Sequence, residues 1–225
     1  TAMADLASRT DDAELYEACK ALWHSIVRKR MYITGAIGST VHGEAFTVDY
    51  DLPSDTVYGE TCASIGLMFF ARQMLQNEIR GEYADTMERA FYNTVLGGME
   101  ITGERFFYVN PLEVIPGITQ SACTHHHVLT QRPKWYTCAC CPPNAARLIS
   151  SLGTYAYAEK DSTCYCHLFC DGKVSFSNGI TLTCETDYPY DFSVRYTVNG
   201  KGTLAIRIPQ WSKTYILKIN SNIIT

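Results

Sequence analysis

Three cysteines lie within four positions near the middle of the chain, in the stretch CACC from Cys138 to Cys141. Pro142 and Pro143 and a short apolar pattern follow, and they predict a turn and then the start of a helix. Thiols crowded in this way can bind a metal ion, form a disulfide or supply a nucleophile. Because the positive end of a helix that begins beside them stabilises thiolates, the stretch is a candidate reactive site.

Two other stretches hold side chains that can join these thiols. The sequence YGETC supplies Glu60 and Cys62, and HGEAF, in a glycine-bearing loop, supplies Glu44. A glutamate and a cysteine from YGETC, with Cys140 and Cys141, make a set of four ligands that Zn²⁺ accepts in a tetrahedral shell. Residues i and i+2 lie on different sides of a helix, so Glu60 and Cys62 can share an ion only from an irregular segment just before a helix.

The same residues also allow readings without catalysis. Cys62 can be a small core residue, the two glutamates can be solvated, and Cys140 and Cys141 can be a buried thiol pair or a vicinal disulfide. At the level of the whole chain, the alternatives are a zinc-stabilised structural or carbohydrate-binding domain and a thiol redox protein. The redox reading requires a reversible disulfide among Cys138, Cys140 and Cys141.

Two further groups have the residue types of metal sites. His125 to His127 are consecutive in a predicted loop, where we expect them to be exposed to solvent rather than ligands. Cys164, Cys166 and Cys170 resemble a second thiol set, but Cys164 and Cys166 alternate along a predicted strand. Both would then face one side of a sheet, and we expect a packing role for them.

The composition is that of an ordinary globular protein, with 225 residues, 46% hydrophobic and 19% charged. A net charge of −4 gives no reason to expect nucleic acid as a partner. No run of about 18 apolar residues predicts a membrane span, and the first residues do not resemble a signal peptide. The ten cysteines leave the compartment open; we expect reduced thiols around Cys138 to Cys141 and slightly favour the cytoplasm.

Hydrophobic periodicity divides the chain into a helical part and a β part. Apolar residues at three- and four-residue steps predict four helices. The first covers about residues 12–29, the second begins near Thr61, the third ends at Gly97, and the fourth covers residues 143–152. The glycine-bearing stretch 32–60 predicts a long irregular loop, which is uncommon unless it is functional. After about Gly153, short alternating runs separated by Asp-Gly and Asn-Gly pairs predict strands joined by hairpin turns.

Five motifs together resemble a known family of enzymes. HGEAF, YGETCAS, MERAFYN, FFYVNPLE and CACCPPNAARLISSLGTYAY occur in this order between Met31 and Tyr157. They are similar to motifs of glycoside hydrolase family 127, the β-L-arabinofuranosidase family. The resemblance implies an (α/α)6 barrel followed by β-sandwich domains. This chain would hold the second half of the barrel, residues 1–153, and an incomplete β-sandwich domain, residues 154–225.

The resemblance also implies roles for individual residues. The zinc ligands would be Glu60, Cys62, Cys140 and Cys141. Cys140, the first of the adjacent pair, would be the nucleophile, Glu44 the general acid/base, and Tyr108 of FFYVNP would lie near the sugar. The implied activity is a retaining hydrolase that releases β-L-arabinofuranose or a related rare pentose. Its substrate would be an arabinose-containing oligosaccharide or glycoconjugate, and a homodimer is among the assemblies left open.

Elementary chemistry is consistent with these roles. A retaining glycosidase needs a nucleophile on one face of the anomeric carbon and a proton donor on the other. Zinc deprotonates its thiol ligands, and three thiolates, one carboxylate and Zn²⁺ sum to a formal charge of about −2. This excess charge would keep the sulfur electron-rich and favour a positive transition state.

Overall fold

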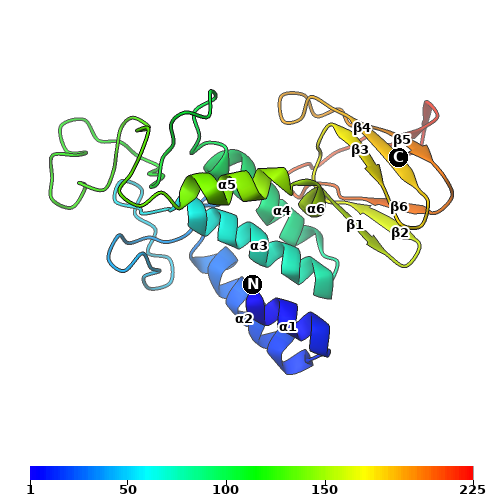
Figure 1. The fold of residues 1–225 in the computed structure, drawn as a ribbon, viewed down its shortest axis with the longest axis horizontal. Coiled ribbons are helices and arrows are strands. Elements are labelled where there is room, and N and C mark those ends of the chain that lie inside the picture. Colours follow the sequence, from blue (N-terminus) through cyan, green and yellow to red (C-terminus); the bar gives the residue numbers. More distant parts are fainter. Residues whose placement is uncertain (225) are drawn as a thin grey trace. The chain divides into compact units, whose positions relative to one another are not determined.

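The computed structural model describes residues 1–224, and the chain divides into two compact units, Thr1–Leu152 and Gly153–Thr225. Helices and long loops make up the first unit, and small sheets make up most of the second (Figure 1). This agrees with the mixed helix and sheet content predicted from the sequence. The half-barrel and the β-sandwich remain predictions.

The first unit contains five α-helices and one π-helix. They are α1 (Ala2–Thr10), α2 (Ala13–Lys29), α3 (Thr61–Asn77), α4 (Gly81–Ala90), the π-helix η1 (Phe91–Val95) and α5 (Cys141–Ser150). The fourth predicted helix begins two residues earlier than expected, at Cys141 rather than Pro143. Because the first N–H groups of a helix have no intrahelical partner, the two prolines fit its first turn without losing a hydrogen bond. None of the helices in residues 1–224 has both the length and the apolar character to cross a membrane.

Helix α3 is the central element of the first unit. It contacts α1, α4 and α5, and it buries side chains around much of its circumference, as its sequence predicts (Figure 1). Trp23 of α2 packs edge-on against Phe70 of α3 and Tyr83 of α4, with ring centroids 5.5 and 4.9 Å apart. Leu22 is 49% exposed, because the buried face of α2 is centred on Cys19 and Trp23.

The two long irregular segments, residues 30–60 and 96–140, gather at the end of the first unit where α3 and α5 begin (Figure 1). Isolated backbone bridges order them, including Thr40 with Ala45 and Glu60 with Val109. The amide of Gly59 donates to the carbonyl of Gly38 at 2.8 Å. The predicted loop is therefore irregular but hydrogen-bonded, and it lies beside the N-terminus of α3.

The second unit opens with the short helix α6 (Gly153–Ala156), followed by eight strands. They are β1 (Tyr157–Lys160), β2 (Thr163–Cys166), β3 (Gly172–Ser175), β4 (Thr181–Glu185), β5 (Arg195–Asn199), β6 (Thr203–Ile206), β7 (Lys218–Ile219) and β8 (Asn222–Ile223). The sheets have the orders β1-β2-β6, β3-β4-β5 and β7-β8. Cys164 and Cys166 are both buried on one face of β2, so the packing role predicted for them fits their positions.

Only part of the hairpin prediction for this unit is correct. Asn178-Gly179 lies in the turn between the antiparallel neighbours β3 and β4. Asp171-Gly172 and Asn199-Gly200 instead lie where the chain passes from one sheet to the other, and β6 pairs in parallel with β2. Turn residues indicate where the chain reverses locally. They do not indicate which strands become neighbours, because strand pairing depends on contacts between segments distant in sequence.

Gly35 provides a test of how tightly the loop is packed on the helices. Its φ is +82°, and a Cβ placed on it would lie 2.6 Å from Cα and N of Ala90. We expect Gly35→Ala to destabilise the protein by about 2 kcal/mol or more, because both the backbone and its neighbour would have to move. Denaturant unfolding of the purified protein measures this change.

Gly66 is the matched control. It lies inside α3, and a Cβ there has no neighbouring atom within 4 Å. Gly66→Ala should be neutral or stabilise the protein by roughly 0.5–1 kcal/mol, because alanine is the better helix former. Equal unfolding midpoints for the two variants would contradict the close packing of the loop against Ala90.

Candidate metal and active site

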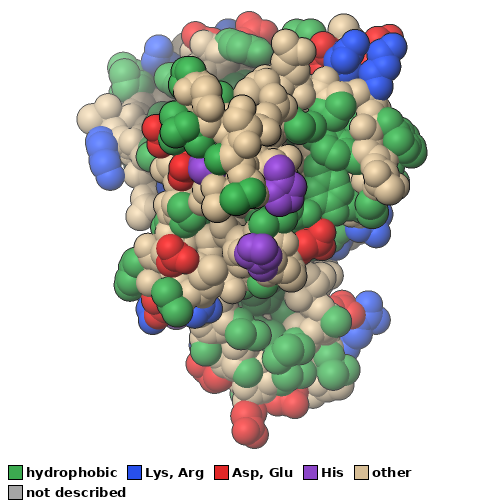
Figure 2. All heavy atoms as spheres, turned by 90° about the vertical axis from the view of Figure 1, so that its left-hand side faces the viewer, with side chains coloured by type: hydrophobic (Ala, Val, Ile, Leu, Met, Phe, Trp, Pro, Cys, Tyr) green, Lys and Arg blue, Asp and Glu red, His purple; other side chains and the backbone are tan. Residues whose placement is uncertain are grey.

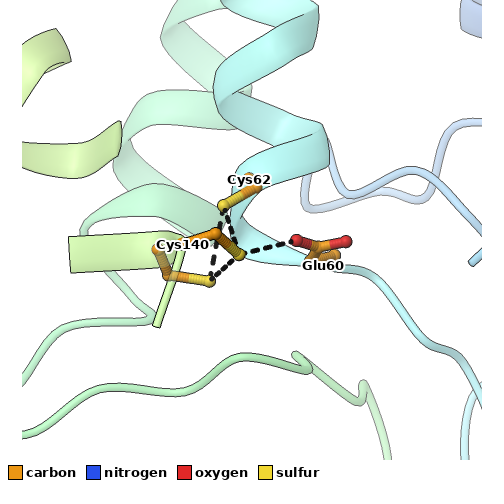
Figure 3. A group of neighbouring side chains, drawn as sticks. Glu60, Cys62 and Cys140 are labelled. Carbon is orange, nitrogen blue, oxygen red and sulfur yellow. Dashed lines mark hydrogen bonds between the residues drawn. The ribbon is translucent and has the colours of Figure 1, made fainter. Parts of the chain in front are cut away.

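Four side chains distant in sequence converge in the first unit. The ligand atoms of Glu60, Cys62, Cys140 and Cys141 all lie within 4.8 Å of one another (Figure 3). The Sγ atom of Cys62 is 3.2 Å from that of Cys140 and 3.6 Å from that of Cys141, and the adjacent pair is 3.9 Å apart. Oε1 of Glu60 lies 3.3 Å from Sγ of Cys140.

These separations fit a shared ion better than a disulfide. A tetrahedral shell with Zn–S bonds of about 2.3 Å places its sulfurs about 3.8 Å apart. A disulfide would require a sulfur–sulfur separation of about 2.05 Å, and all ten cysteines are free. Three thiols and one carboxylate are also a donor set that zinc accepts, so the residues present fit the metal that the sequence predicts.

Two helix N-termini bring the four ligands together. Glu60 is the N-cap of α3, with a non-helical backbone (φ −59°, ψ 134°), and Cys62 lies in the first turn. The glutamate is thus outside the helix, as the i and i+2 spacing requires. Cys140 is the N-cap of α5 and Cys141 its first residue. The positive ends of both helices therefore favour negative charge on the sulfurs.

A neighbouring extended segment fixes the position of Tyr108. The amide of Thr61 donates to the carbonyl of Tyr108 at 3.0 Å, and the Thr61 hydroxyl donates to the carbonyl of Phe107 at 2.8 Å. The amide of Tyr108 in turn donates to the hydroxyl of Tyr136 at 3.1 Å. Burial, followed by the influence of the neighbouring Cys140, raises the pKa of the Tyr108 phenol.

Glu44 lies on the turn between the bridged residues Thr40 and Ala45. Its φ is +50° and that of the preceding Gly43 is +72°, so a residue with a side chain occupies the left-handed region. Such a conformation costs on the order of 1 kcal/mol and is found preferentially at functional sites. The carboxylate is exposed, and its Oε1 accepts a hydrogen bond of 2.8 Å from the hydroxyl of Tyr58.

The three thiols of the cluster do not ionise alike. The hydrogen bond with Cys141, helped by one from Asn144, lowers the pKa of Cys62 to about 7. Burial, reinforced by Cys62 and Glu60, raises the pKa of Cys140 to about 12. The hydrogen bond to Cys62, followed by burial, raises the pKa of Cys141. Without a cation the cluster therefore holds one thiolate near neutral pH, and a divalent ion is needed to ionise all three.

Sequence reasoning missed two residues that contact this site. Asn144 donates from Nδ2 to Sγ of Cys62 at 3.1 Å, and its own Oδ1 accepts from Arg147 at 2.7 Å. It lies one turn beyond Cys140 and Cys141 along α5, a spacing that could have identified it. The other is Tyr58, two residues before Glu60, whose hydroxyl donates to Oε1 of Glu44. Gly59 between them has a φ of +50°, so strand periodicity could not have identified it.

The remaining candidate groups do not form metal sites. Nε2 of the buried His125 lies 2.8 Å from Oδ2 of Asp55, so the expectation that this histidine is exposed was wrong. Nε2 of His127 is hydrogen-bonded to the carbonyl of Thr56, and only His126 of the three is exposed. Within residues 1–224, the group of His, Cys, Asp and Glu side chains with metal-ligand spacing is the one described above: Glu60, Cys62, Cys140 and Cys141.

Figure 2 shows the face of the first unit on which the long loops lie. Histidine side chains are at its surface among hydrophobic, uncharged and a few acidic ones, and most Lys and Arg side chains lie towards the margins of the view. This distribution suits a neutral ligand better than a polyanion.

Comparison with known proteins assigns the chain to a family. Residues 1–154 match the model of the β-L-arabinofuranosidase GH127 catalytic domain, and residues 163–224 match the model of the GH127 middle domain. The chain belongs to glycoside hydrolase family 127. The resemblance noted from the five motifs is thus confirmed.

Characterised and solved relatives agree with this assignment. A non-reducing end β-L-arabinofuranosidase of Bifidobacterium longum subsp. longum is 43% identical over 98% of this chain and 35% of its own length. The crystal structure of a GH127 β-L-arabinofuranosidase from Geobacillus stearothermophilus T6 is 45% identical, with a TM-score of 0.94 over 100% of this chain and 36% of that one. A second GH127 β-arabinofuranosidase structure is 31% identical, with a TM-score of 0.86 over 99% of this chain and 37% of that one. The chain thus spans about a third of the length of these relatives.

The cluster predicts a specific pattern of metal binding. We expect one Zn²⁺ per chain, and we expect Cys141→Ser to weaken its binding by more than about 100-fold, because even changes outside the ligand set cost 10- to 100-fold. Competition with a chromophoric chelator, together with elemental analysis after dialysis, measures both quantities. Cys138→Ser is the control, since Cys138 is exposed and lies outside the cluster, and it should bind zinc like the parent protein. Equal losses in the two variants would exclude the site.

Zinc binding should also release protons. The pKa values of Cys140 and Cys141 are raised and that of Cys62 is about 7, so the metal-free cluster is largely protonated at pH 7. A bound ion requires thiolates, and we expect roughly two to three protons to leave per ion. By linkage, the affinity must rise with pH between 6 and 8. Calorimetry in buffers of different ionisation enthalpy counts the protons, and a release of fewer than one would contradict the three-thiolate set.

Proposed function

We propose that the protein is a retaining glycoside hydrolase that removes β-L-arabinofuranose, or a closely related pentose, from the non-reducing end of an oligosaccharide or glycoconjugate. Family membership and the named activities of the relatives support the substrate class. The observation that carries the mechanism is the position of Cys140. It belongs to the four-residue cluster, and Glu44 is held by a hydrogen bond from Tyr58, whose ring packs against that of Tyr108.

Zinc would be held by the four clustered side chains, Glu60, Cys62, Cys140 and Cys141. When bound, it supplies the positive charge that keeps the thiols ionised, while the ligands leave the site with a net negative charge. Cys141 is 2% exposed, whereas Cys140 is only half-buried, so Cys140 is the thiolate of the adjacent pair that a sugar can approach.

In the first step, the Sγ thiolate of Cys140 attacks the anomeric carbon and forms a C–S bond. The C–O bond to the leaving group breaks at the same time, and Glu44 transfers its proton to the departing oxygen. The positive charge that develops on the sugar ring is stabilised by the negative charge of the cluster. Tyr108, which is hydrogen-bonded through its carbonyl to Thr61 beside the cluster, would contact the sugar.

In the second step, Glu44 acts as a base. A water molecule loses a proton to the carboxylate and attacks the anomeric carbon from the side that the leaving group vacated. The C–S bond breaks, and its electrons return to Sγ of Cys140 as a thiolate. Two inversions at the same carbon give net retention of configuration, and Glu44 ends the cycle protonated.

The chain's part in the complete enzyme is also a proposal. Residues 1–153 would contribute the later helices of an (α/α)6 barrel, and residues 154–225 the beginning of a β-sandwich domain. The long loops beside the N-termini of α3 and α5 would then line the sugar pocket. Sugar contacts from earlier helices would come from outside the present sequence.

Cys140→Ser is the direct test of the nucleophile. In the complete natural protein that contains this sequence, we expect kcat to fall on the order of 10³-fold or more, because a hydroxyl cannot replace the thiolate. Cys138→Ser, with a change of the same kind at an exposed position, should retain near-parent activity. Near-normal rates for Cys140→Ser would overturn the assignment.

A thiol-reactive arabinofuranose analogue separates this function from the alternatives. Mass spectrometry should show one adduct, on Cys140, which is lost in Cys140→Ser and kept in Cys138→Ser. A purely structural zinc site would give no adduct at Cys140. A thiol redox protein would instead show a reversible loss of two mass units among Cys138, Cys140 and Cys141 under oxidant.

A further inference from the structure

We propose that Tyr58 is a positioning residue for the acid/base Glu44, and that it determines which carboxyl oxygen carries the catalytic proton. This inference rests on the proposed function. Tyr58 is neither a proposed zinc ligand nor a group that forms or breaks a bond in the proposed mechanism. The inference follows from its hydrogen bond to Glu44 and from the backbone of Glu44.

The hydroxyl of Tyr58 lies 2.8 Å from Oε1 of Glu44. Within residues 1–224, it is the side-chain partner that the structure shows for this carboxylate. An ionised carboxylate has only acceptor atoms, so the phenol is the donor in this hydrogen bond and Oε1 of Glu44 is the acceptor. A proton on the carboxyl group must then reside on Oε2, which is left to face the leaving oxygen.

Tyr58 is itself fixed on several sides, which a positioning residue requires. Its side chain is 7% exposed, and its ring packs edge-on against Tyr108 with centroids 6.0 Å apart and lies 6.3 Å from His127. Its carbonyl accepts from the amide of Asn110 at 3.3 Å. Glu44, by contrast, is exposed on a turn. The rigid partner therefore determines the orientation of the carboxyl group.

Tyr58 also relates the candidate proton donor to the ligand cluster through packing. It donates to Glu44, and its ring packs against that of Tyr108, whose carbonyl accepts from the amide of Thr61 in the first turn of α3, between Glu60 and Cys62. This packing limits how far Glu44 can move relative to the cluster that holds Cys140, and the two groups must lie on opposite faces of the sugar.

The test compares leaving groups in Tyr58→Phe, using the complete natural protein that contains this sequence. A sugar leaving group depends on proton donation, whereas a dinitrophenolate leaves with little help. Since kcat/KM reports the steps up to departure of the leaving group, we expect a loss of about 10- to 100-fold with an arabinose disaccharide. With the dinitrophenyl arabinofuranoside, we expect a loss of less than about 3-fold.

Tyr32→Phe is the matched control. Tyr32 is 3% exposed, and its hydroxyl has no hydrogen-bond partner among the described residues, so removing it changes packing as little as in Tyr58→Phe. Both substrates should react with this variant at parent rates. The ratio of the two kcat/KM values in one preparation does not depend on the folded fraction, so partial unfolding of Tyr58→Phe cannot produce the expected change in ratio.

A double variant separates failure of this inference from failure of the proposed function. Glu44→Gln alone should show a large loss with the disaccharide, and adding Tyr58→Phe to it should change the ratio less than about twofold, because the carboxyl proton is already absent. A uniform loss with both substrates in Tyr58→Phe, or parent rates with both, would overturn the role of Tyr58 while leaving Glu44 in place. If Glu44→Gln itself shows no dependence on the leaving group, the proposed function fails first.

Discussion

The constraint on which the site depends is the crowding of negative charge at one point. Three sulfurs and a carboxylate lie within 4.8 Å of one another, at the N-termini of α3 and α5. Burial, followed by the neighbouring Cys62 and Glu60, raises the pKa of Cys140, and the hydrogen bond with Cys62, followed by burial, raises that of Cys141. The two helix dipoles offset part of this cost, and Asn144 offsets a further part by donating to Cys62. A cation is needed to offset the rest of the cost of ionising three neighbouring thiols. Ionisation of Cys140, the proposed nucleophile, would therefore be coupled to metal binding.

The rest of the first unit keeps these groups in place. Helix α3 is buried on most sides, so its N-terminus, with Glu60 and Cys62, cannot shift without disturbing the core. Hydrogen bonds from Thr61 fasten the segment that carries Tyr108 to the same point. Catalytic groups need placement to within a fraction of an ångström, and here the most buried helix and the segment bonded to it provide that precision.

The sequence was sufficient to predict that four side chains form one cluster, but not which residues hold them in place. Few roles other than metal binding bring three thiols and a carboxylate together, which is why their residue types pointed to one cluster: Glu60, Cys62, Cys140 and Cys141. Glu60 also lies just before a helix, as the spacing argument required. The helices also followed from their apolar periodicity. Tyr58, Asn144 and the parallel pairing of β6 with β2 could not be inferred, because each depends on contacts between segments that local sequence does not bring together. In the sequence Tyr58 cannot be told from an ordinary core tyrosine, because its role depends on the hydrogen bond to Glu44 that only the structure shows.

The proposed nucleophile, Cys140, and the proposed acid/base, Glu44, are held in different ways, and this difference has a physical reason. Cys140 begins a helix and is attached to the core through α5, whereas Glu44 lies on a turn with a left-handed backbone. The nucleophile forms and breaks a bond at one carbon and gains from rigidity. The acid/base must give a proton to one oxygen and later take one from a different molecule, so its carboxyl group needs some freedom within limits. One hydrogen bond from a packed phenol supplies those limits without removing the freedom, since a single donor fixes one oxygen and leaves the other free to exchange its proton.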